Sequence, residues 1–370
     1  MPHNNLLYRT MKIALPLWSV VCPIIGLAVM MLVGETHSGI MDLVMGVALI
    51  SVVLSAVHHA EVVAHKVGEP FGTLILALAI TVIEVALIVT IMMSKGGEES
   101  STLARDTVFA AIMLILTGII GLCLLIGGYR YKEQIFMKQG VSASLVALTA
   151  ITVLSLVLPN YTTSEAGPVY STSQLIFVAI ISLVLYLGFV GVQTGRHRDY
   201  FLPEDKTKED ENVHAAPPNN LTASLSLLLL LIALVVVVIL SKKLSPTIET
   251  IVVDLGAPKS LVGIIIASVI LLPEGMAAIR AARRNRLQTS LNLALGSALA
   301  SIGLTIPAVA IVGYFTGFTI TLGIDTKSTV LLILSLFTIS ISFGAGRTNI
   351  LQGIVLLVIL ATYLFTTIVP

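Results

Sequence analysis

Long runs of apolar residues, each close to the length needed to cross a bilayer, recur through the whole chain. A helix needs about 20 mostly apolar residues to cross the hydrocarbon core. Eleven stretches qualify, covering residues 13–33, 40–57, 71–93, 107–128, 142–159, 173–193, 221–241, 260–280, 288–313, 328–344 and 350–369. Backbone groups in lipid must be satisfied within their own segment, and the runs lack the alternation of barrel strands. We therefore expect an all-α polytopic membrane protein with 11 transmembrane helices.

Composition excludes several other classes of protein. Only 11% of the 370 residues are charged, against about 25% in an average soluble domain. The mean hydropathy of +1.01 likewise argues against a large soluble α-helical protein. A net charge of +1 gives no indication of a nucleic-acid partner. Cys22 and Cys123 both lie in apolar runs, so no disulfide framework is predicted. The first apolar run, Ala14–Val33, is too long for a signal-peptide core and lacks an A-x-A cleavage site, so we interpret it as a transmembrane helix.

The connections between the apolar runs predict the orientation of the chain. With a cytoplasmic N-terminus, 15 of the 21 Lys and Arg residues fall in cytoplasmic connections. This asymmetry predicts the N-terminus inside and the C-terminus outside. We expect a multi-pass protein of the bacterial inner (plasma) membrane, with the lipid bilayer as its constant partner. Small residues such as Gly313 and Gly317 could pack helices within a protomer or between the protomers of a homo-oligomer.

One long polar connection divides the chain into two sets of five apolar runs. We place an N-terminal region with the first helix at 1–39, a first repeat at 40–193, an acidic cytoplasmic linker at 194–220 and a second repeat at 221–370. Because five is odd, the second set must insert in the opposite sense to the first. Inverted repeats of this kind build many secondary transporters, whose binding site lies at the midplane. The linker reads as a solvated connection, with cation or pH sensing as the functional alternative.

Each set of five carries one carboxylate inside its second apolar run. Glu84 lies in the middle of FGTLILALAITVIEVALIVTIMM, and Glu274 lies in LVGIIIASVILLPEGMAAI. A carboxylate in the bilayer costs roughly 2.5–3.5 kcal/mol on insertion scales, so it normally faces a protein interior or a water-filled cavity on an ion or proton path. The structural alternative is a glutamate that is only hydrogen-bonded within the bundle. We expect Glu84 and Glu274 to lie against each other as the cation- and proton-binding metal ligands.

Paired carboxylates offer a physical mechanism for exchange. Loaded with one divalent cation or two protons, the pair is neutral and can reorient. Empty and ionised, it would carry two uncompensated charges in a low-dielectric site, and that state should rarely cross. Cations would then move one way and protons the other.

The sequence around Glu274 predicts an irregular helix. Pro273 has no N–H to donate and clashes with the carbonyl four residues back, that of Val269. Gly275 permits further irregularity. We therefore expect a helix break that frees a carbonyl oxygen, the kind of ligand that a hard cation such as calcium prefers.

Small polar side chains near the glutamates are candidate accessory ligands. Thr81 precedes Glu84 by three residues, and four further side chains recur at intervals of four or five residues, namely Asn292, Ser297, Ser301 and Thr305. That spacing keeps them loosely on one helical face. The alternative for each is an ordinary helix contact, for which Ser and Thr are common in membranes.

A second titratable group precedes the Glu84 run. The segment HHAEVVAHKVGEP places His58, Glu61, His65 and Glu69 along one helical face, with His59 beside them. The simpler interpretation is an interfacial amphipathic turn. The functional alternative is a cytoplasmic gate or pH sensor, since His titrates near neutrality.

Several motifs together resemble the calcium/proton exchangers of the cation/calcium exchanger superfamily. They are HHAEVVAHKVGEPFGTLILAL, ITVIEVALI, RDTVFAAIM, LPEGMAAI, NLALGSALASIGLTIP and GRTNILQG, in order around the two glutamates. The match is strongest to the bacterial calcium/proton antiporters that also handle sodium and potassium, and it spans nearly the whole chain. The resemblance implies one plus five plus five helices, cation ligation by Glu84 and Glu274, and alternating access.

The chain departs from the wider family near both glutamates. The Gly-Asn pair typical of that family is Ile80-Thr81 in the first repeat and Ile270-Leu271 in the second. Gly275 stands where a His often follows the second glutamate, and Ala300 replaces a common Gln. Fewer amide oxygens would relax the preference for calcium and widen the range of cations.

Our leading hypothesis is a secondary active cation/proton antiporter that exports Ca²⁺, and also Na⁺ or K⁺, in exchange for H⁺. It has no chemical step, so we expect no enzyme activity and no cofactor, with inorganic cations and protons as the transported species. The alternatives are a sodium/calcium exchanger, separated by proton dependence without sodium, and a cation channel, which would conduct without counter-transport. An intramembrane hydrolase or metalloenzyme is disfavoured, because neither HExxH nor G-x-S-x-G is present.

Overall fold

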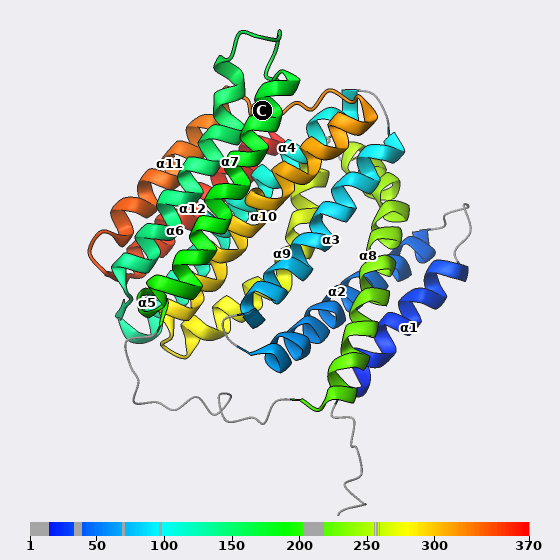
Figure 1. The fold of residues 1–370 in the computed structure, drawn as a ribbon, viewed down its shortest axis with the longest axis horizontal. Coiled ribbons are helices and arrows are strands. Elements are labelled where there is room, and N and C mark those ends of the chain that lie inside the picture. Colours follow the sequence, from blue (N-terminus) through cyan, green and yellow to red (C-terminus); the bar gives the residue numbers. More distant parts are fainter. Residues whose placement is uncertain are drawn as a thin grey trace, which may run out of the picture. The chain divides into compact units, whose positions relative to one another are not determined.

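The structure is a computed structural model, and it is helical almost throughout (Figure 1). It describes residues 15–32, 39–68, 71–95, 98–202, 218–254, 256, 258 and 260–369. The α-helices are α1 (Leu17–Leu32), α2 (Gly39–Val67), α3 (Phe71–Lys95), α4 (Glu98–Met113), α5 (Ile120–Tyr131), α6 (Lys138–Thr152), α7 (Thr172–Gly191), α8 (Asn220–Asp254), α9 (Ser260–Arg283), α10 (Leu287–Thr316), α11 (Thr326–Phe343) and α12 (Ile350–Ile368).

Short segments of other helix types extend or join these helices. The π-helix η1 (Leu114–Ile119) joins α4 to α5, so that both belong to one helical span. The π-helix η2 (Val153–Val157) and the 3₁₀-helix η3 (Leu158–Tyr161) continue α6. The π-helix η4 (Val192–Arg196) and the 3₁₀-helix η5 (Arg198–Phe201) follow α7.

These helices confirm the predicted class of protein. In the described part of the chain, nine helical spans are long and apolar enough to cross a membrane, and the apolar segments Leu17–Leu32 and Thr81–Thr90 are shorter. Together they fall at the eleven predicted runs. Some helices extend beyond the apolar runs into polar sequence, so their predicted lengths were too short. Helix α2 continues ten residues past position 57, and α8 continues through Pro246 to Asp254. Hydropathy marks where lipid ends, whereas a helix can continue into water.

The chain forms two compact units that do not follow the two predicted repeats. The first unit comprises residues 1–79 and 209–240, and the second comprises residues 80–208 and 241–370. Two of the three boundaries fall inside α3 and α8, and the third, between residues 208 and 209, falls within the polar linker. The division at residues 194–220 therefore stays a prediction, and residues 203–217 of that linker lie outside the described part.

In the first unit, α1 packs closely against α2. A Cβ atom on Gly26 would lie 2.4 Å from Cγ2 of Val52, so a larger residue would force the Val52 side chain or the helices to shift. The backbone carbonyl of Ser19 accepts hydrogen bonds from Ser55 Oγ (2.6 Å) and lies 2.8 Å from Nε2 of His59. These polar contacts and the glycine contact bind the two helices together.

In the second unit, α10 is the central helix. It packs against α4, α6, α7 and α9, and its side chains at Leu291, Leu299 and Ile302 are fully buried. Helix α12 packs against α5. Two short antiparallel strands, β1 (Glu133–Ile135) and β2 (Arg347–Asn349), pair with Glu133 opposite Asn349 and tie the α5–α6 connection to the α11–α12 connection.

The α5–α12 contact depends on glycine. A Cβ atom on Gly353 would lie 2.4 Å from the backbone nitrogen of Leu125, and one on Gly128 would lie 2.6 Å from that of Ile350. Since the opposing atoms are backbone, neither contact can be relieved by moving a side chain.

We predict that Gly353→Ala destabilises the protein, because α5 and α12 would be forced apart. Overpacking typically costs about 1–3 kcal/mol. The matched control is Gly188→Ala in α7, where nothing lies within 4 Å of the added Cβ and alanine favours the helix. Thermal unfolding in detergent should show a lower Tm for Gly353→Ala and an unchanged or higher Tm for Gly188→Ala. Equal midpoints would show that the helices separate without cost.

Candidate functional site

Both intramembrane glutamates are hydrogen-bonded by side chains of the central helix. Glu84 lies on α3 and Glu274 on α9, and both belong to the second compact unit. Ser301 Oγ of α10 donates to Glu84 Oε1 at 2.7 Å, and Ser297 Oγ donates to Glu274 Oε2. Ser297 and Ser301 are four residues apart, which places them on one face of α10. A single helix thus holds both carboxylates.

The glutamates differ in their exposure. Glu84 is 4% exposed, whereas Glu274 is only partly buried. The two carboxylates are also close enough to interact electrostatically. Burying a charge is costly unless it is paired or hydrogen-bonded, and each serine supplies one donor to one carboxylate. A proton or a cation would satisfy what remains.

Thr81 and Thr305 are two further buried polar residues on the helices that carry the site. Thr81 is 3% exposed and lies almost one turn before Glu84 on α3. Thr305 follows Ser301 by one turn on α10, is fully buried, and its hydroxyl has no hydrogen-bond partner within the described residues. A buried hydroxyl normally has a partner. Thr305 is therefore free to accept a water or another ligand.

Helix α9 spans Ser260–Arg283 with Pro273 inside it, so Pro273 does not end the helix. The predicted irregularity and freed carbonyl at this position stay a prediction. A proline within a helix removes the one hydrogen bond that its N–H would donate. The other backbone groups in a membrane helix still need partners within the helix, which favours its continuation past the proline. The carbonyl of Val269 still lacks the N–H that another residue would supply at position 273. Gly275 packs closely against η1, because a Cβ there would lie 3.3 Å from Ile119 Cδ1.

Asn292 lies on the same helix but is bonded elsewhere. Its Nδ2 donates to the backbone carbonyl of Phe201 at 2.6 Å, and its Oδ1 accepts from Gln288 Nε2 at 2.8 Å. The amide thus ties α10 to the segment after α7. Of the five predicted accessory residues, Ser297 and Ser301 contact the glutamates, and Asn292 is occupied by these other contacts.

The predicted histidine group divides into two parts. His59 is fully buried beside the Ser19 carbonyl, and His58 lies against Trp18 with ring centroids 5.2 Å apart and the rings tilted by 51°. Glu61 and His65 are exposed on the last turns of α2. Glu69 lies outside the described residues. The sequence pattern gave no indication that α1 would cover the first two histidines.

Carboxylates and imidazoles alone could not enclose a cation here. Among the described residues, no group of three or more His, Cys, Asp or Glu side chains is placed to hold a metal ion. A cation at Glu84 and Glu274 would need neutral oxygens to complete its shell. The hydroxyls of α10 are the neighbours of the two carboxylates, and hard cations accept such oxygen ligands.

Comparison with known proteins identifies the family. The sequence profile of the family described as "Sodium/calcium exchanger protein" matches residues 37–195 and 225–369. The chain belongs to this family. It is 44% identical over 359 residues to the "Putative ionic transporter y4hA" of Sinorhizobium fredii, with 96% of this chain and 97% of that protein covered. It is 33% identical over 353 residues to the "Sodium-potassium/proton antiporter ChaA" of Escherichia coli, covering 94% and 95%.

Solved structures show the fold. The structure of native YfkE superposes with a TM-score of 0.71 at 18% identity, covering 95% of this chain and 99% of that one. The H⁺/Ca²⁺ exchanger CAX superposes with a TM-score of 0.68 at 17% identity, covering 94% and 88%. These superpositions confirm the exchanger fold predicted from the resemblance. The matches to the two relatives and the two solved structures each cover nearly the whole of this chain.

We predict that Ser301→Ala lowers stability more than the same change at another buried serine. Removing Ser301 Oγ leaves a buried carboxylate short of a donor, which costs about 1–3 kcal/mol. The matched control is Ser144→Ala in α6, because Ser144 is also buried but its hydroxyl bonds only the carbonyl of Gly140 on its own helix (3.0 Å). Thermal unfolding in detergent measures both variants. Equal shifts in Tm would mean that the bond to Glu84 contributes nothing.

Proposed function

We propose that this chain is a secondary active antiporter that exports Ca²⁺, and also accepts Na⁺ or K⁺ as a substrate, in exchange for H⁺. The observation that carries the proposal is the binding of both intramembrane glutamates by one helix, through Ser297 and Ser301. Transport would proceed by alternating access at this two-glutamate site. The substrates are the cation and the proton, and no enzyme step or cofactor is involved.

Charge balance at the site couples the two substrates. One divalent cation, or two protons, would neutralise Glu84 and Glu274. The empty pair would carry two negative charges, and their desolvation would oppose the conformational change. Only loaded forms then reorient at a useful rate, which is the requirement for exchange in place of leakage.

Relatives support both kinds of substrate. The E. coli relative is named as a sodium-potassium/proton antiporter. A relative that is 26% identical over 315 residues, from Aphanothece halophytica, is named as a Ca²⁺/H⁺ antiporter. Both names include the proton, which favours proton coupling over the sodium/calcium exchange in the family's description.

The ligands near the glutamates favour a broad range of cations. Thr81 stands where the wider family typically has an amide, and the amide of Asn292 is bonded to Phe201 and Gln288. Among the described residues, the hydroxyls of Ser297 and Ser301 are neutral oxygens beside the glutamates. Pro273 also leaves the carbonyl of Val269 without its usual donor. We expect a ligand shell of this kind to select less strictly among cations than a shell that includes amide oxygens.

We further propose the location and orientation of the protein. It lies in the bacterial inner membrane with its N-terminus in the cytoplasm and its C-terminus outside, because most Lys and Arg residues then lie on the cytoplasmic side. His58, His59, Glu61, His65 and Glu69 would then lie toward the cytoplasm, where a gate or pH sensor could act.

We predict that Glu84→Gln and Glu274→Gln each abolish exchange, because a neutral amide can neither balance a cation nor carry a proton. The matched control is Glu165→Gln, which changes an exposed carboxylate in the α6–α7 connection. The measurement is proton flux in vesicles with an imposed pH gradient, with Ca²⁺, Na⁺ and K⁺ added separately. Wild type and Glu165→Gln should dissipate the gradient when the transported cation is added.

Three outcomes would contradict the proposal. Exchange that persists in either site variant would remove the two-glutamate mechanism. Calcium flux that requires sodium and ignores pH would indicate a sodium/calcium exchanger. Downhill cation flux without proton movement in folded wild type would indicate a channel.

A further inference from the structure

A backbone carbonyl of α1 has lost its helical donor and is bonded by α2 instead. Pro23 lies inside α1, so it has no N–H to give to the carbonyl four residues back, which is that of Ser19. Ser55 Oγ of α2 donates to this oxygen at 2.6 Å, and His59 Nε2 lies 2.8 Å from it. All three of these polar residues are fully buried. Two side chains of α2 therefore replace the donor that Pro23 removes.

The carbonyl determines which nitrogen of His59 carries hydrogen. A carbonyl oxygen can only accept a hydrogen bond, so the hydrogen lies on Nε2. In the neutral ring Nδ1 is then without a hydrogen, and among the described residues it has no hydrogen-bond partner. A second proton could bind only at Nδ1, and it would turn the ring into a buried cation.

The neighbours of His59 on α1 and α2 would not stabilise that cation. Helix α1 carries one titratable side chain, Cys22. Glu61 lies two residues beyond His59 and is exposed, and residues two apart on a helix do not face each other. His58 lies beside His59 with ring centroids 5.8 Å apart, and its own protonation would repel a second positive charge.

The other helical parts of the first unit contribute no balancing charge. Residues 220–240 of α8 and 71–79 of α3 contain no Asp, Glu, His, Lys or Arg. Along α2, Asp42 lies in the first turn, whereas His65 and Lys66 lie in the last turn and are basic. A buried charge without a partner is costly. The α1–α2 contact therefore requires the neutral ring.

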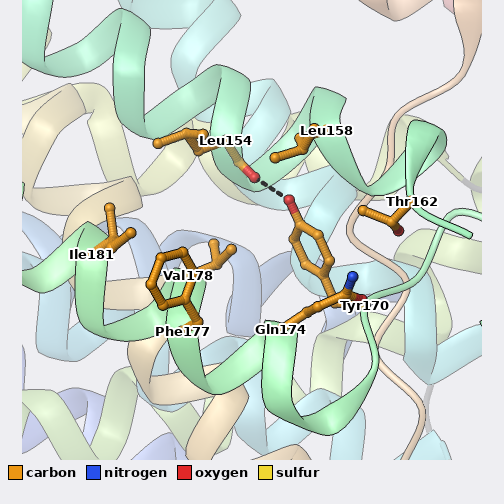
Figure 2. Close-up of a pocket in the computed structure, with 8 residues that line it drawn as sticks. All are labelled: Leu154, Leu158, Thr162, Tyr170, Gln174, Phe177, Val178 and Ile181. Carbon is orange, nitrogen blue, oxygen red and sulfur yellow. Dashed lines mark hydrogen bonds between the residues drawn. The ribbon is translucent and has the colours of Figure 1, made fainter. Parts of the chain in front are cut away.

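A second carbonyl at an irregular point of a helix has a donor that does not titrate near neutrality. Figure 2 shows Tyr170, whose hydroxyl donates at 2.5 Å to the carbonyl of Leu154 in the π-helix η2. Burial raises the pKa of Tyr170 to about 12, so this bond persists over the physiological range. At the α1–α2 contact the same role falls to a histidine, a residue type that titrates at about pH 6.5 when unperturbed.

We propose that His59 is a proton-operated latch between α1 and α2. The latch is closed when the imidazole is neutral and bonded to the Ser19 carbonyl. It opens when a second proton binds at Nδ1, because the charged ring must leave its buried position to be solvated. The bond to α1 is lost with that movement, and α1 separates from α2.

The consequence for transport rests on the function proposed above. Exchange would bring protons into the cytoplasm, and His59 would lie toward that side of the membrane. Helix α2 is followed along the chain by α3, which carries Glu84. An opened latch frees α2 and, with it, the start of the helix that holds this glutamate. Exchange would therefore slow as the cytoplasm acidifies, which limits further proton entry.

Hydrogen exchange of α1 tests the latch without a transport measurement. Amide exchange of purified wild type in detergent is followed by mass spectrometry at about pH 8 and about pH 6, with each rate corrected for the exchange of an unstructured peptide at that pH. At the lower pH the α1 peptide should lose about tenfold in protection, because helices that are no longer held together open locally. The α12 peptide should keep its protection.

His59→Gln separates the latch from other effects of pH. Glutamine keeps an N–H donor for the Ser19 carbonyl but binds no proton near neutrality, so α1 should stay protected at both pH values. The matched control is His65→Gln, which changes an exposed histidine of the same helix and should behave as wild type. Equal loss of α1 protection in wild type and His59→Gln, or wild-type protection that ignores pH, would overturn the proposal.

Ser55→Ala supplies a second variant if His59→Gln fails to fold. The closed latch then has one of its two bonds, so less proton binding is needed to open it. The loss of α1 protection should move to higher pH than in wild type. A transition at an unchanged pH would contradict the latch.

Proton flux in everted vesicles gives the regulatory readout, because the bath then sets the pH on the cytoplasmic side. Compared with wild type, His59→Gln should exchange about threefold faster at about pH 6 and equally fast at about pH 8. Identical pH profiles would overturn the regulatory role. Absence of exchange in wild type and both glutamine variants would instead overturn the proposed function, while hydrogen exchange would still decide the latch.

Discussion

The structure depends on the cost of holding two carboxylates away from water. Helix α10 lowers that cost through two hydrogen bonds, from Ser301 to Glu84 and from Ser297 to Glu274. The two serines lie one helical turn apart. Among the described residues, each serine gives one hydrogen bond to one carboxylate. The negative charge that these bonds do not neutralise is what a proton or a cation can balance, and it is the physical basis of the exchange that we propose.

The rest of the second unit is closely packed around this arrangement. Close helix approaches at Gly303, Gly128 and Gly353 admit backbone or side-chain atoms where any larger residue would intrude. Asn292 fixes the other end of α10 to the carbonyl of Phe201. A polar site in a membrane is thus supported by small residues at helix contacts and by hydrogen bonds of an amide side chain, neither of which contacts the glutamates.

Much of this could be predicted from the sequence, because lipid restricts the options so strongly. Apolar runs predict the helices, and a buried Glu84 or Glu274 has few roles other than function. The four-residue spacing of Ser297 and Ser301 correctly indicated a shared face. Other features depend on tertiary neighbours that no local pattern encodes. Asn292 is bonded to Phe201, a partner far along the chain, and Pro273 is accommodated within a continuous helix.

The most direct test of the account is the number of protons released when a cation binds. Purified protein in a weakly buffered detergent solution would receive Ca²⁺, Na⁺ or K⁺, with choline as the control salt and a pH indicator as the readout. The account predicts that the transported cation releases protons from wild type but not from a Glu84→Gln/Glu274→Gln double variant. Cation binding to wild type by calorimetry with no proton release would contradict it, because the two substrates would then not share the carboxylates.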